Sequence, residues 1–341
     1  MMNCMQDRIK VSVIIPTHNR REELKKLLIS LEKQTLPKEN FEIIVVDDGS
    51  TDRTEFLAKE MVSKFGWHLN YISVFKQPNV GIVKNIGAQK AKGEILTFID
   101  SDCTAHPEWL KNILKMFNNQ KIGCAGGAEL THPDDSLFAK CCSFSVTSFF
   151  TTGGIRGKKG IKLAKYYPRG FNMAIPRSDF QKILGFNPGF NYSDDIELSY
   201  RIKEDGYTLG YAPDAIVYHR RPDTITKNFK QLFRMAFCRI AVARVHKAML
   251  EPVYFLPPVF LISALILSIG SFFFKTLIFL TKWFYLGILS YLLAIGFIAG
   301  FKLKGLRAFF LVPFVFVIHQ TAYATGFLYG FLKYVMLRKN Q

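Results

Sequence analysis

The stretch GEILTFIDSD, residues 93–102, joins a short apolar run to a pair of aspartates, Asp100 and Asp102. A run of this length, bounded by glycine on one side and polar residues on the other, predicts a buried β-strand over residues 94–99. Two earlier runs have the same form: VSVIIP at 11–16 and FEIIVV at 41–46 both end in polar residues. Three buried strands with polar ends are typical of a sheet that binds a ligand at one edge.

Helical patterns lie between these strands, and strands that alternate with helices predict an α/β fold with a mainly parallel sheet. Ligands bind such sheets beyond the carboxyl ends of the strands, so Asp47, Asp48, Asp100 and Asp102 are expected to meet there. The predicted helices span residues 21–34, 54–65 and 82–92, and a further strand spans 69–75.

Carboxylates this close repel one another unless a cation lies between them. Asp100 and Asp102 are two residues apart, and an extended backbone points such side chains to the same face. Their oxygen ligands suit Mg²⁺ or Mn²⁺. Isolated loop aspartates more often form turns or cap helices, so both interpretations stay open at this point.

Two common phosphate-binding motifs are absent. The sequence has neither GxxxxGK[ST] nor GxGxxG after its first strand, which argues against a P-loop NTPase and a dinucleotide-binding fold. If a nucleotide binds, its diphosphate must be neutralised by a metal ion and by basic side chains.

The last third of the chain is basic and apolar. The 341 residues carry a net charge of +18, and residues 227–341 contain fourteen basic residues and one acid, Glu251. Three segments there, 253–274, 283–301 and 308–332, lack charged residues and are long enough to cross a bilayer. We expect a membrane anchor and no nucleic-acid binding, because the basic residues lie among apolar runs.

The basic loop at 302–307 indicates the orientation, because basic loops of membrane proteins face the cytoplasm. The N-terminal domain is then cytoplasmic, in agreement with the lack of an apolar signal peptide before Arg8 and with six cysteines that form no CxxC pair. A third crossing would place the basic C-terminus outside, so the path of the third segment stays open.

Residues 227–250 combine apolar positions at helical spacing with basic residues. This pattern predicts an amphipathic helix on an anionic bilayer surface, and a surface helix packed on the soluble part is the alternative. The predicted division is a soluble α/β domain at 1–226, this interfacial helix, and a transmembrane region at 251–341.

Four motifs follow one another along the chain: VSVIIPTHNR, VVDDGSTD, QPNVGIVKNIGAQKAKGEILTFIDSD and RGFNMAIPRSDFQKILGFNPGFNYSDDIELSYRIKEDGY. In order and spacing they resemble the family 2 glycosyltransferases, which have the GT-A fold. The resemblance covers residues 10–219. It implies an enzyme that uses a nucleotide sugar together with Mg²⁺ or Mn²⁺.

The resemblance also implies roles for single residues. Asp48 is expected to contact the nucleotide base, and Asp102 to bind the metal directly with Asp100 as second member of the pair. Lys84 stands where the family often has arginine. The lysine keeps the positive charge but lacks the guanidinium group that could form two parallel hydrogen bonds. His219 matches a position of a further metal or phosphate contact in some members, with a structural histidine as the alternative. The residues implied for nucleotide-sugar binding are Pro16, Thr17, Asn19, Asp47, Asp48, Lys84, Asp100, Ser101 and Asn172.

The segment SDDIEL, residues 193–198, matches the acceptor-side motif, in which the family usually has Glu-Asp at the positions of Asp194 and Asp195. Asp195 is then the catalytic base that takes the proton of an attacking hydroxyl. Its neighbour Asp194 would raise the pKa of Asp195 by charge repulsion. A capping box formed by Asp194 and Glu197 is the structural alternative.

Gln231 and Arg234 resemble part of the QxxRW element of processive membrane-bound members, with Met235 in place of the tryptophan. The resemblance implies that they contact the acceptor or a phosphate. The full interpretation is an inverting transferase that moves a sugar from a UDP- or GDP-sugar to a lipid-linked or polyprenyl-phosphate acceptor. It would act at the cytoplasmic face of a bacterial or archaeal membrane, in cell-surface glycan synthesis. The alternatives are a processive polysaccharide synthase and a catalytically silent GT-A module that binds membranes.

Overall fold

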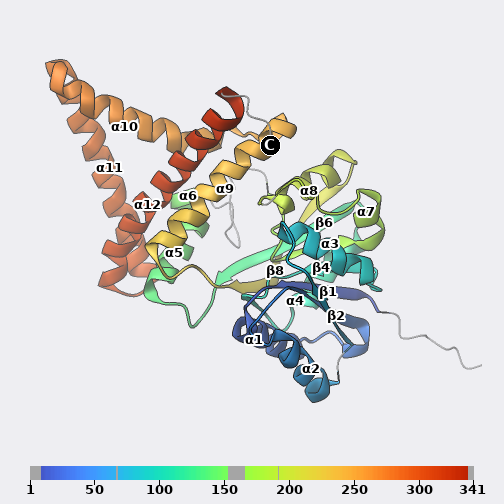
Figure 1. Ribbon diagram of the computed structural model, residues 1–341. Helices are drawn as coiled ribbons and strands as arrows, with labels where there is room; N and C mark the ends of the chain where they lie inside the picture. The colour runs from blue at the N-terminus through green and yellow to red at the C-terminus, as the bar shows by residue number, and fades with distance from the viewer. Residues whose placement is uncertain (1–8, 67, 153–165, 191, 337–341) are drawn as a thin grey trace, which may run out of the picture. The chain divides into compact units, whose positions relative to one another are not determined.

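The computed structural model describes residues 9–66, 68–152, 166–190 and 192–336. The chain forms two compact units (Figure 1): unit 1 is Met1–His132 with Tyr166–Arg220, and unit 2 is Pro133–Lys165 with Arg221–Gln341. The strands of unit 1 are β1 (Val11–Thr17), β2 (Phe41–Asp48), β3 (Leu69–Val74), β4 (Ile95–Phe98), β5 (Cys103–Ala105), β6 (Ile122–Thr131), β7 (Met173–Pro176) and β8 (Thr208–His219). Its helices are α1 (Arg21–Glu32), α2 (Thr54–Phe65), α3 (Val80–Lys90), α4 (Trp109–Leu114), α7 (Arg177–Lys182) and α8 (Asp194–Glu204).

The strands of unit 1 form one sheet with the order β3-β2-β1-β4-β7-β6-β8-β5 among the described residues. Strands β3, β2, β1 and β4 are parallel, and β6 is parallel to β8. Strand β7 is antiparallel to both of its neighbours, and β5 is antiparallel to β8. The prediction of an α/β fold with a mainly parallel sheet is therefore confirmed.

Strand β1 is buried along its whole length, which explains its continuous apolar sequence. Val13 and Ile15 pack in one hydrophobic cluster with residues of α1, α2 and α4. Ile14, on the opposite face, packs in a second cluster with residues of α3, α7 and α8. The sheet thus lies between two layers of helices.

Helix α3 lies unusually close to the sheet. A Cβ atom at Gly87 would lie 2.6 Å from Cγ2 of Ile14 and 3.0 Å from Cγ2 of Val46, so only glycine fits. The helix begins at Val80, before the predicted start at residue 82, because the side chain of Asn79 accepts a hydrogen bond from the Ile82 amide. This close packing places the side chains of α3 next to the carboxyl ends of the strands.

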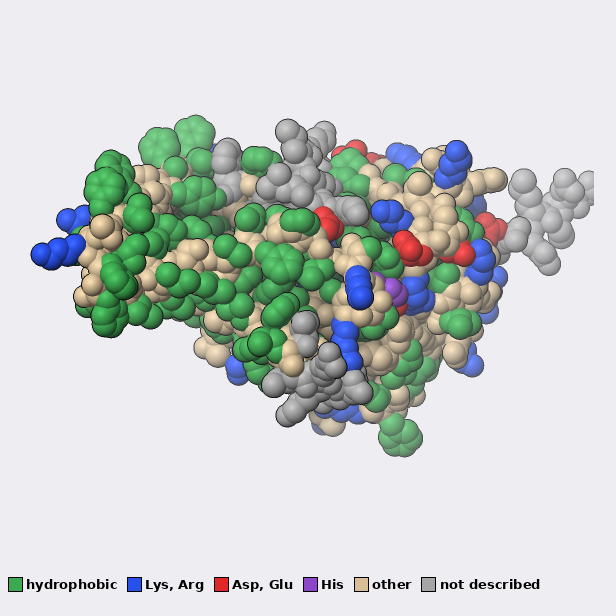
Figure 2. Space-filling model, turned by 90° about the horizontal axis from the view of Figure 1, so that it is seen from above, with side chains coloured by type: hydrophobic (Ala, Val, Ile, Leu, Met, Phe, Trp, Pro, Cys, Tyr) green, Lys and Arg blue, Asp and Glu red, His purple; other side chains and the backbone are tan. Residues whose placement is uncertain are grey.

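Unit 2 is helical, and three of its described helices are long and apolar enough to cross a membrane. The second, Lys275–Lys302, extends well beyond the predicted segment 283–301, because the helix continues through the charged residue Lys282. Hydrophobic side chains cover much of the visible surface of this unit (Figure 2). The helices of unit 2 are α5 (Leu137–Thr147), α6 (Phe149–Thr152), α9 (Ile225–Val245), α10 (Leu256–Phe273), α11 (Lys275–Lys302) and α12 (Leu306–Phe331).

Helix α9 corresponds to the predicted amphipathic helix, and its apolar face packs on α12. A Cβ atom at Gly326 would overlap the backbone of Phe233, and one at Gly330 would lie 3.2 Å from the Phe237 carbonyl oxygen. Small residues four positions apart allow two helices to approach in this way. The position of α9 on a bilayer surface stays a prediction.

The segment 133–165 belongs to unit 2 although it interrupts unit 1 in the sequence. Its helix α5 packs through Cys141, Cys142 and Phe144 against α11 and α12. The predicted soluble domain at 1–226 includes this segment, and a helix of eleven residues is too short to indicate a membrane span. The predicted boundary at residue 226 lies close to Arg221, where the chain enters unit 2 for the second time.

The substitution Gly326→Val is expected to destabilise unit 2, because α9 must move away from α12 to make room for the added side chain. Overpacking of this kind costs roughly 1–3 kcal/mol, so the Tm of the full chain in detergent should fall. The control is Gly287→Val in α11, where no atom lies within 4 Å of an added Cβ. Equal Tm values for the two variants would contradict the packing described here.

Candidate active site

The carboxyl ends of β1, β2 and β4 lie at one edge of the sheet, because these strands are adjacent and parallel. Thr17 at the end of β1 is paired with Asp47 near the end of β2. Thr17 is buried, and its hydroxyl has no hydrogen-bond partner within the described residues. Since a buried hydroxyl without a partner is unfavourable, this edge is suited to bind a polar ligand.

Asp47 and Asp48 have different surroundings. Asp47 is buried, and its carboxylate accepts hydrogen bonds from the Ser50 amide (2.8 Å) and from the Tyr71 hydroxyl. Burial and the contact with Asp47 raise the pKa of Tyr71. Asp48 is partly exposed and accepts a hydrogen bond from the Gln77 amide at 2.6 Å. Asp47 therefore stabilises the loop, while Asp48 is accessible to a ligand.

Asn19 joins the loop after β1 to the loop after β2. Its backbone has a positive φ of 50°, and its side-chain oxygen accepts a hydrogen bond from the Thr51 amide at 2.8 Å. Pro16 is buried in β1, and Ser101 is buried beside the two aspartates. The contacts of these three residues with a nucleotide stay predictions.

Lys84 lies buried between two carboxylates. Its Nζ is 3.9 Å from Oδ1 of Asp100 and 3.7 Å from Oδ2 of Asp194, and it lies over the ring of Phe186 at 5.1 Å. Burial lowers the pKa of Lys84, but Asp194 and Asp100 outweigh that effect and raise it above its ordinary value. The lysine therefore stays charged and links the loop after β4 to the start of α8.

Asp194 and Asp195 open α8 and differ in exposure. Asp194 is buried, and burial raises its pKa to about 6 although Lys84 opposes this shift. Asp195 is partly exposed, and its Oδ2 accepts a hydrogen bond from the Gly170 amide at 2.9 Å. Of the two carboxylates, Asp195 is the one with an exposed surface that a substrate can approach.

Glu197, one turn into α8, is buried and binds Arg201 through two contacts of 2.8 and 2.9 Å. Arg201 lies one turn further along the same helix. Ser193, the residue before α8, makes no capping hydrogen bond with its side chain. The capping box of Asp194 and Glu197 stays a prediction.

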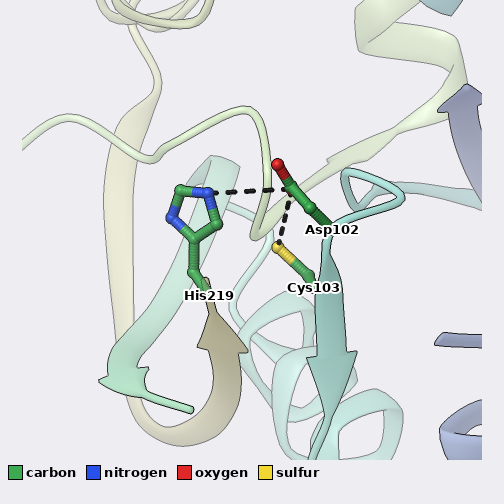
Figure 3. Close-up of side chains that lie close together, drawn as sticks. All are labelled: Asp102, Cys103 and His219. Atoms are coloured by element: carbon green, nitrogen blue, oxygen red, sulfur yellow. Dashed lines mark hydrogen bonds and ion pairs between the residues drawn. The ribbon is translucent and has the colours of Figure 1, made fainter. Parts of the chain in front are cut away.

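A second cluster contains Asp102 and His219, which point toward each other from the start of β5 and the end of β8 (Figure 3). Nε2 of His219 is 3.7 Å from Oδ1 of Asp102, which is too long for a hydrogen bond. Two such ligand atoms facing each other across a gap fit a divalent cation that binds both. This pair is the part of the described structure that suits Mg²⁺ or Mn²⁺ best.

The thiol of Cys103 lies in the same cluster. Burial raises its pKa well above the ordinary value, and the carboxylate of Asp102 adds to this effect. Cys103 therefore stays protonated at neutral pH, and a thiol is a poor ligand for Mg²⁺ or Mn²⁺. The five described cysteines form no disulfide with one another, and Cys4 lies outside the described residues.

Asp100 and Asp102 do not share their partners. Residues 101 and 102 form a turn, so the extended backbone predicted for this pair is not present. Asp100 faces Lys84, whereas Oδ2 of Asp102 accepts a hydrogen bond from Arg20 at 2.6 Å. The role of Asp100 as a metal ligand stays a prediction.

Asn172 is buried, and its amide group is used within the protein. Its oxygen accepts a hydrogen bond from the Trp109 indole at 2.9 Å, and its nitrogen donates to the carbonyl oxygens of Ala128 (3.2 Å) and Ala215 (3.0 Å). The residue thus joins β6 and β8 near the cluster. Its predicted contact with the donor sugar stays a prediction.

Gln231 and Arg234 lie in unit 2, on α9, and both side chains are exposed. They are three residues apart, so they share one face of the helix. Their predicted contact with an acceptor stays a prediction.

Two residues beside the cluster were missed in the sequence analysis. Arg20 binds Asp102, and Glu129 accepts a hydrogen bond from Nδ1 of His219 at 2.9 Å. The available signal for Glu129 was an acidic residue inside the apolar strand segment 122–130. A buried acid needs a specific partner, and the sequence could not identify that partner ninety residues away.

A family model described as glycosyl transferase family 2 matches residues 12–184, half of the chain. The chain belongs to this family. The matched range contains Lys84, Asp100 and Asp102, whereas Asp195 and His219 lie beyond it, so the roles of these two residues depend on the geometry given above.

Individual relatives of this family 2 glycosyltransferase agree with the assignment. It is 28% identical to the glycosyltransferase AglE of Haloferax volcanii over 247 residues, which are 72% of this chain and 77% of that protein. A segment of 111 residues, 33% of this chain, is 35% identical to 31% of the dolichol-phosphate mannosyltransferase of Pyrococcus furiosus.

A solved mannosyltransferase from Pyrobaculum calidifontis, in complex with GDP-Man and Mn²⁺, has a TM-score of 0.58 with this structure. The match covers 93% of this chain and 87% of that chain at 18% identity. At this identity the likeness shows the shared GT-A fold.

The raised pKa of Asp194 predicts a pH dependence of stability. Below about pH 4, Asp194 is protonated in the folded and in the unfolded protein. In the folded protein it keeps this proton up to about pH 6. The folded protein thus binds more protons between these values, so its stability falls as the pH rises through this range, by at most about 3 kcal/mol. We expect the substitution Asp194→Asn to remove this pH dependence of stability.

The measurement is the Tm of the full chain in detergent from pH 4 to 8. The Tm of the wild type should fall relative to that of Asp194→Asn between about pH 4 and 6. The control is Asp205→Asn at the other end of α8, where the carboxylate is exposed and bound to Lys182. Parallel profiles for wild type and Asp194→Asn would contradict the assignment.

Proposed function

We propose that the protein is an inverting hexosyltransferase that moves a sugar from a UDP- or GDP-sugar to a lipid-linked acceptor at the cytoplasmic face of a membrane. One observation carries the proposal: a partly exposed Asp195, the buried Lys84 and the Asp102–His219 pair lie within one domain at the carboxyl edge of its sheet. This arrangement offers a base for the acceptor hydroxyl, a positive charge, and a metal site that can neutralise a departing diphosphate.

Asp102 and His219 are the residues that would hold Mg²⁺ or Mn²⁺. The bound ion would neutralise the charge that develops on the departing diphosphate. Arg20, whose guanidinium lies 2.6 Å from Asp102, keeps that carboxylate in place on the side away from His219.

Asp195 is proposed as the base that takes the proton of the attacking acceptor hydroxyl. The amide of Gly170 holds one oxygen of its carboxylate at 2.9 Å. A Cβ atom at Gly170 would lie 2.6 Å from Nζ of Lys84 and 3.4 Å from Cβ of Asp195, so glycine leaves room for both the lysine and the base beside this backbone segment. Lys84 in turn compensates the charges of Asp194 and Asp100.

The donor is proposed to bind along the loops after β1 and β2. Asp48 and the buried hydroxyl of Thr17 lie there, and both offer polar atoms to a nucleoside. The solved relative that binds GDP-Man with Mn²⁺ supports a nucleoside-diphosphate sugar as donor.

The acceptor is proposed to be lipid-linked, either a polyprenyl phosphate or a saccharide carried on one. Three apolar helices long enough to cross a bilayer and the resemblance to a dolichol-phosphate mannosyltransferase support this class. Arg234 and Gln231 are exposed on one face of α9, where the guanidinium would bind a lipid phosphate. The basic loop at 302–307 supports a cytoplasmic position of the catalytic domain.

The decisive experiment uses membranes that contain the protein, Mn²⁺ and a panel of labelled UDP- and GDP-sugars, followed by extraction of lipid products. Label in the organic phase is expected from at least one donor. Asp195→Asn should reduce the transfer rate by about 10²–10⁴-fold, because the base is lost while the side chain keeps its size.

The control variant Asp205→Asn changes an exposed acid directly after the same helix and should transfer at the wild-type rate. Label that appears only in polymer would replace the proposed acceptor with a growing polysaccharide. Transfer by Asp195→Asn at the wild-type rate would exclude Asp195 as the base.

A further inference from the structure

Glu129 lies buried in β6 beside His219, and the proposed reaction assigns it no role. Its side chain is 5% exposed, and its Oε1 lies 2.9 Å from Nδ1 of His219. A buried carboxylate is costly unless it is paired or hydrogen-bonded. The imidazole of His219 is a partner of this kind.

We infer that Glu129 is a positioning residue that fixes the tautomer of His219 and thereby strengthens the binding of a divalent metal ion at Asp102 and His219. The inference rests on the proposed metal site. Beyond that site, we infer that its affinity for the metal ion depends on Glu129, a residue that does not touch the ion.

The tautomer follows from the chemistry of the two groups. A carboxylate only accepts hydrogen bonds, so Nδ1 must carry the hydrogen that it donates to Glu129. In the neutral ring, the lone pair then lies on Nε2, the nitrogen that faces Asp102 at 3.7 Å. In the opposite tautomer, Nε2 of His219 would carry the hydrogen and would have no lone pair for a metal ion.

The position of the ring is also fixed by an aromatic contact and by the register of two strands. It stacks on Phe171 with the ring centres 4.4 Å apart, which fixes the plane of the imidazole. Glu129 is paired with Val217, and Thr131 with His219, across the parallel strands β6 and β8. The carboxylate and the imidazole therefore come from adjacent strands whose register fixes their distance.

Asp102 has a comparable partner on its own far side. Arg20 binds Oδ2 of Asp102, while Oδ1 faces His219. Each of the two groups that face the gap is thus oriented by a hydrogen bond on its far side: Asp102 by the Arg20 guanidinium, and His219 by the Glu129 carboxylate. Hydrogen-bonded partners of this kind typically change metal affinity by roughly 10–100-fold when they are replaced.

The test measures Mn²⁺ binding to the full-length protein in detergent, by electron paramagnetic resonance of the free ion and without any substrate. Glu129→Gln keeps the size of the side chain but allows either tautomer, because an amide both donates and accepts. We expect it to weaken Mn²⁺ binding by about 10–100-fold. His219→Ala should also weaken binding, and the double variant should bind no more weakly than His219→Ala alone.

The control is Glu42→Gln. Glu42 is also 5% exposed, in β2 of the same sheet, and accepts hydrogen bonds from the Ser12 hydroxyl and the Lys92 amide, both at 2.6 Å. This variant removes a buried carboxylate away from the cluster. It should alter the Tm but leave Mn²⁺ affinity unchanged, which separates a loss of stability from a loss of metal binding.

Three results would overturn the inference, and they differ in what else they exclude. If His219→Ala binds Mn²⁺ as the wild type does, His219 is not a ligand, and the proposed metal site falls together with the role of Glu129. If His219→Ala weakens binding and Glu129→Gln does not, the metal site stands and only the role of Glu129 falls. If Glu129→Gln weakens binding equally in the His219→Ala background, Glu129 does not act through His219.

Discussion

The charge of one buried amine, that of Lys84, is the constraint on which the arrangement of the site depends. Two carboxylates, from the loop after β4 and from the start of α8, lie within 4 Å of it. A buried charge of this kind is costly unless groups of opposite charge face it. The lysine reaches this place because Gly87 brings α3 against the sheet. The donor side and the acceptor side of the site therefore depend on the same side chain, and neither can change alone.

The sheet and its functional edge were predictable from the sequence because their signals are local. Strands such as Val11–Thr17 are continuous apolar runs, and such runs form buried parallel strands. The order of the strands and helices then places Asp47, Asp48 and Asp102 at one edge. The predicted ends of helices were less accurate where a capping side chain determines the end, as Asn79 does at the start of α3.

The partners of the individual side chains were not predictable, because they depend on contacts between distant segments. Asp100 and Asp102 look equivalent in the sequence, yet the turn between them directs their side chains to different partners. Asp100 faces Lys84, whereas Asp102 faces Arg20 and His219. The pairing of Glu129 with His219 depends on the register of β6 against β8. The same limit applies to α5, which is too short to indicate a membrane helix and whose apolar partners lie far along the chain.

The membership of α5 in unit 2 has a practical meaning for anyone who shortens this enzyme. A chain that ends at Arg220 keeps every strand of the sheet and also keeps α5, but it loses α11 and α12, on which Cys141, Cys142 and Phe144 pack. Those side chains would then face water and favour aggregation. A soluble form of the catalytic domain therefore requires a short polar loop in place of residues 133–165, in addition to removal of the C-terminal helices.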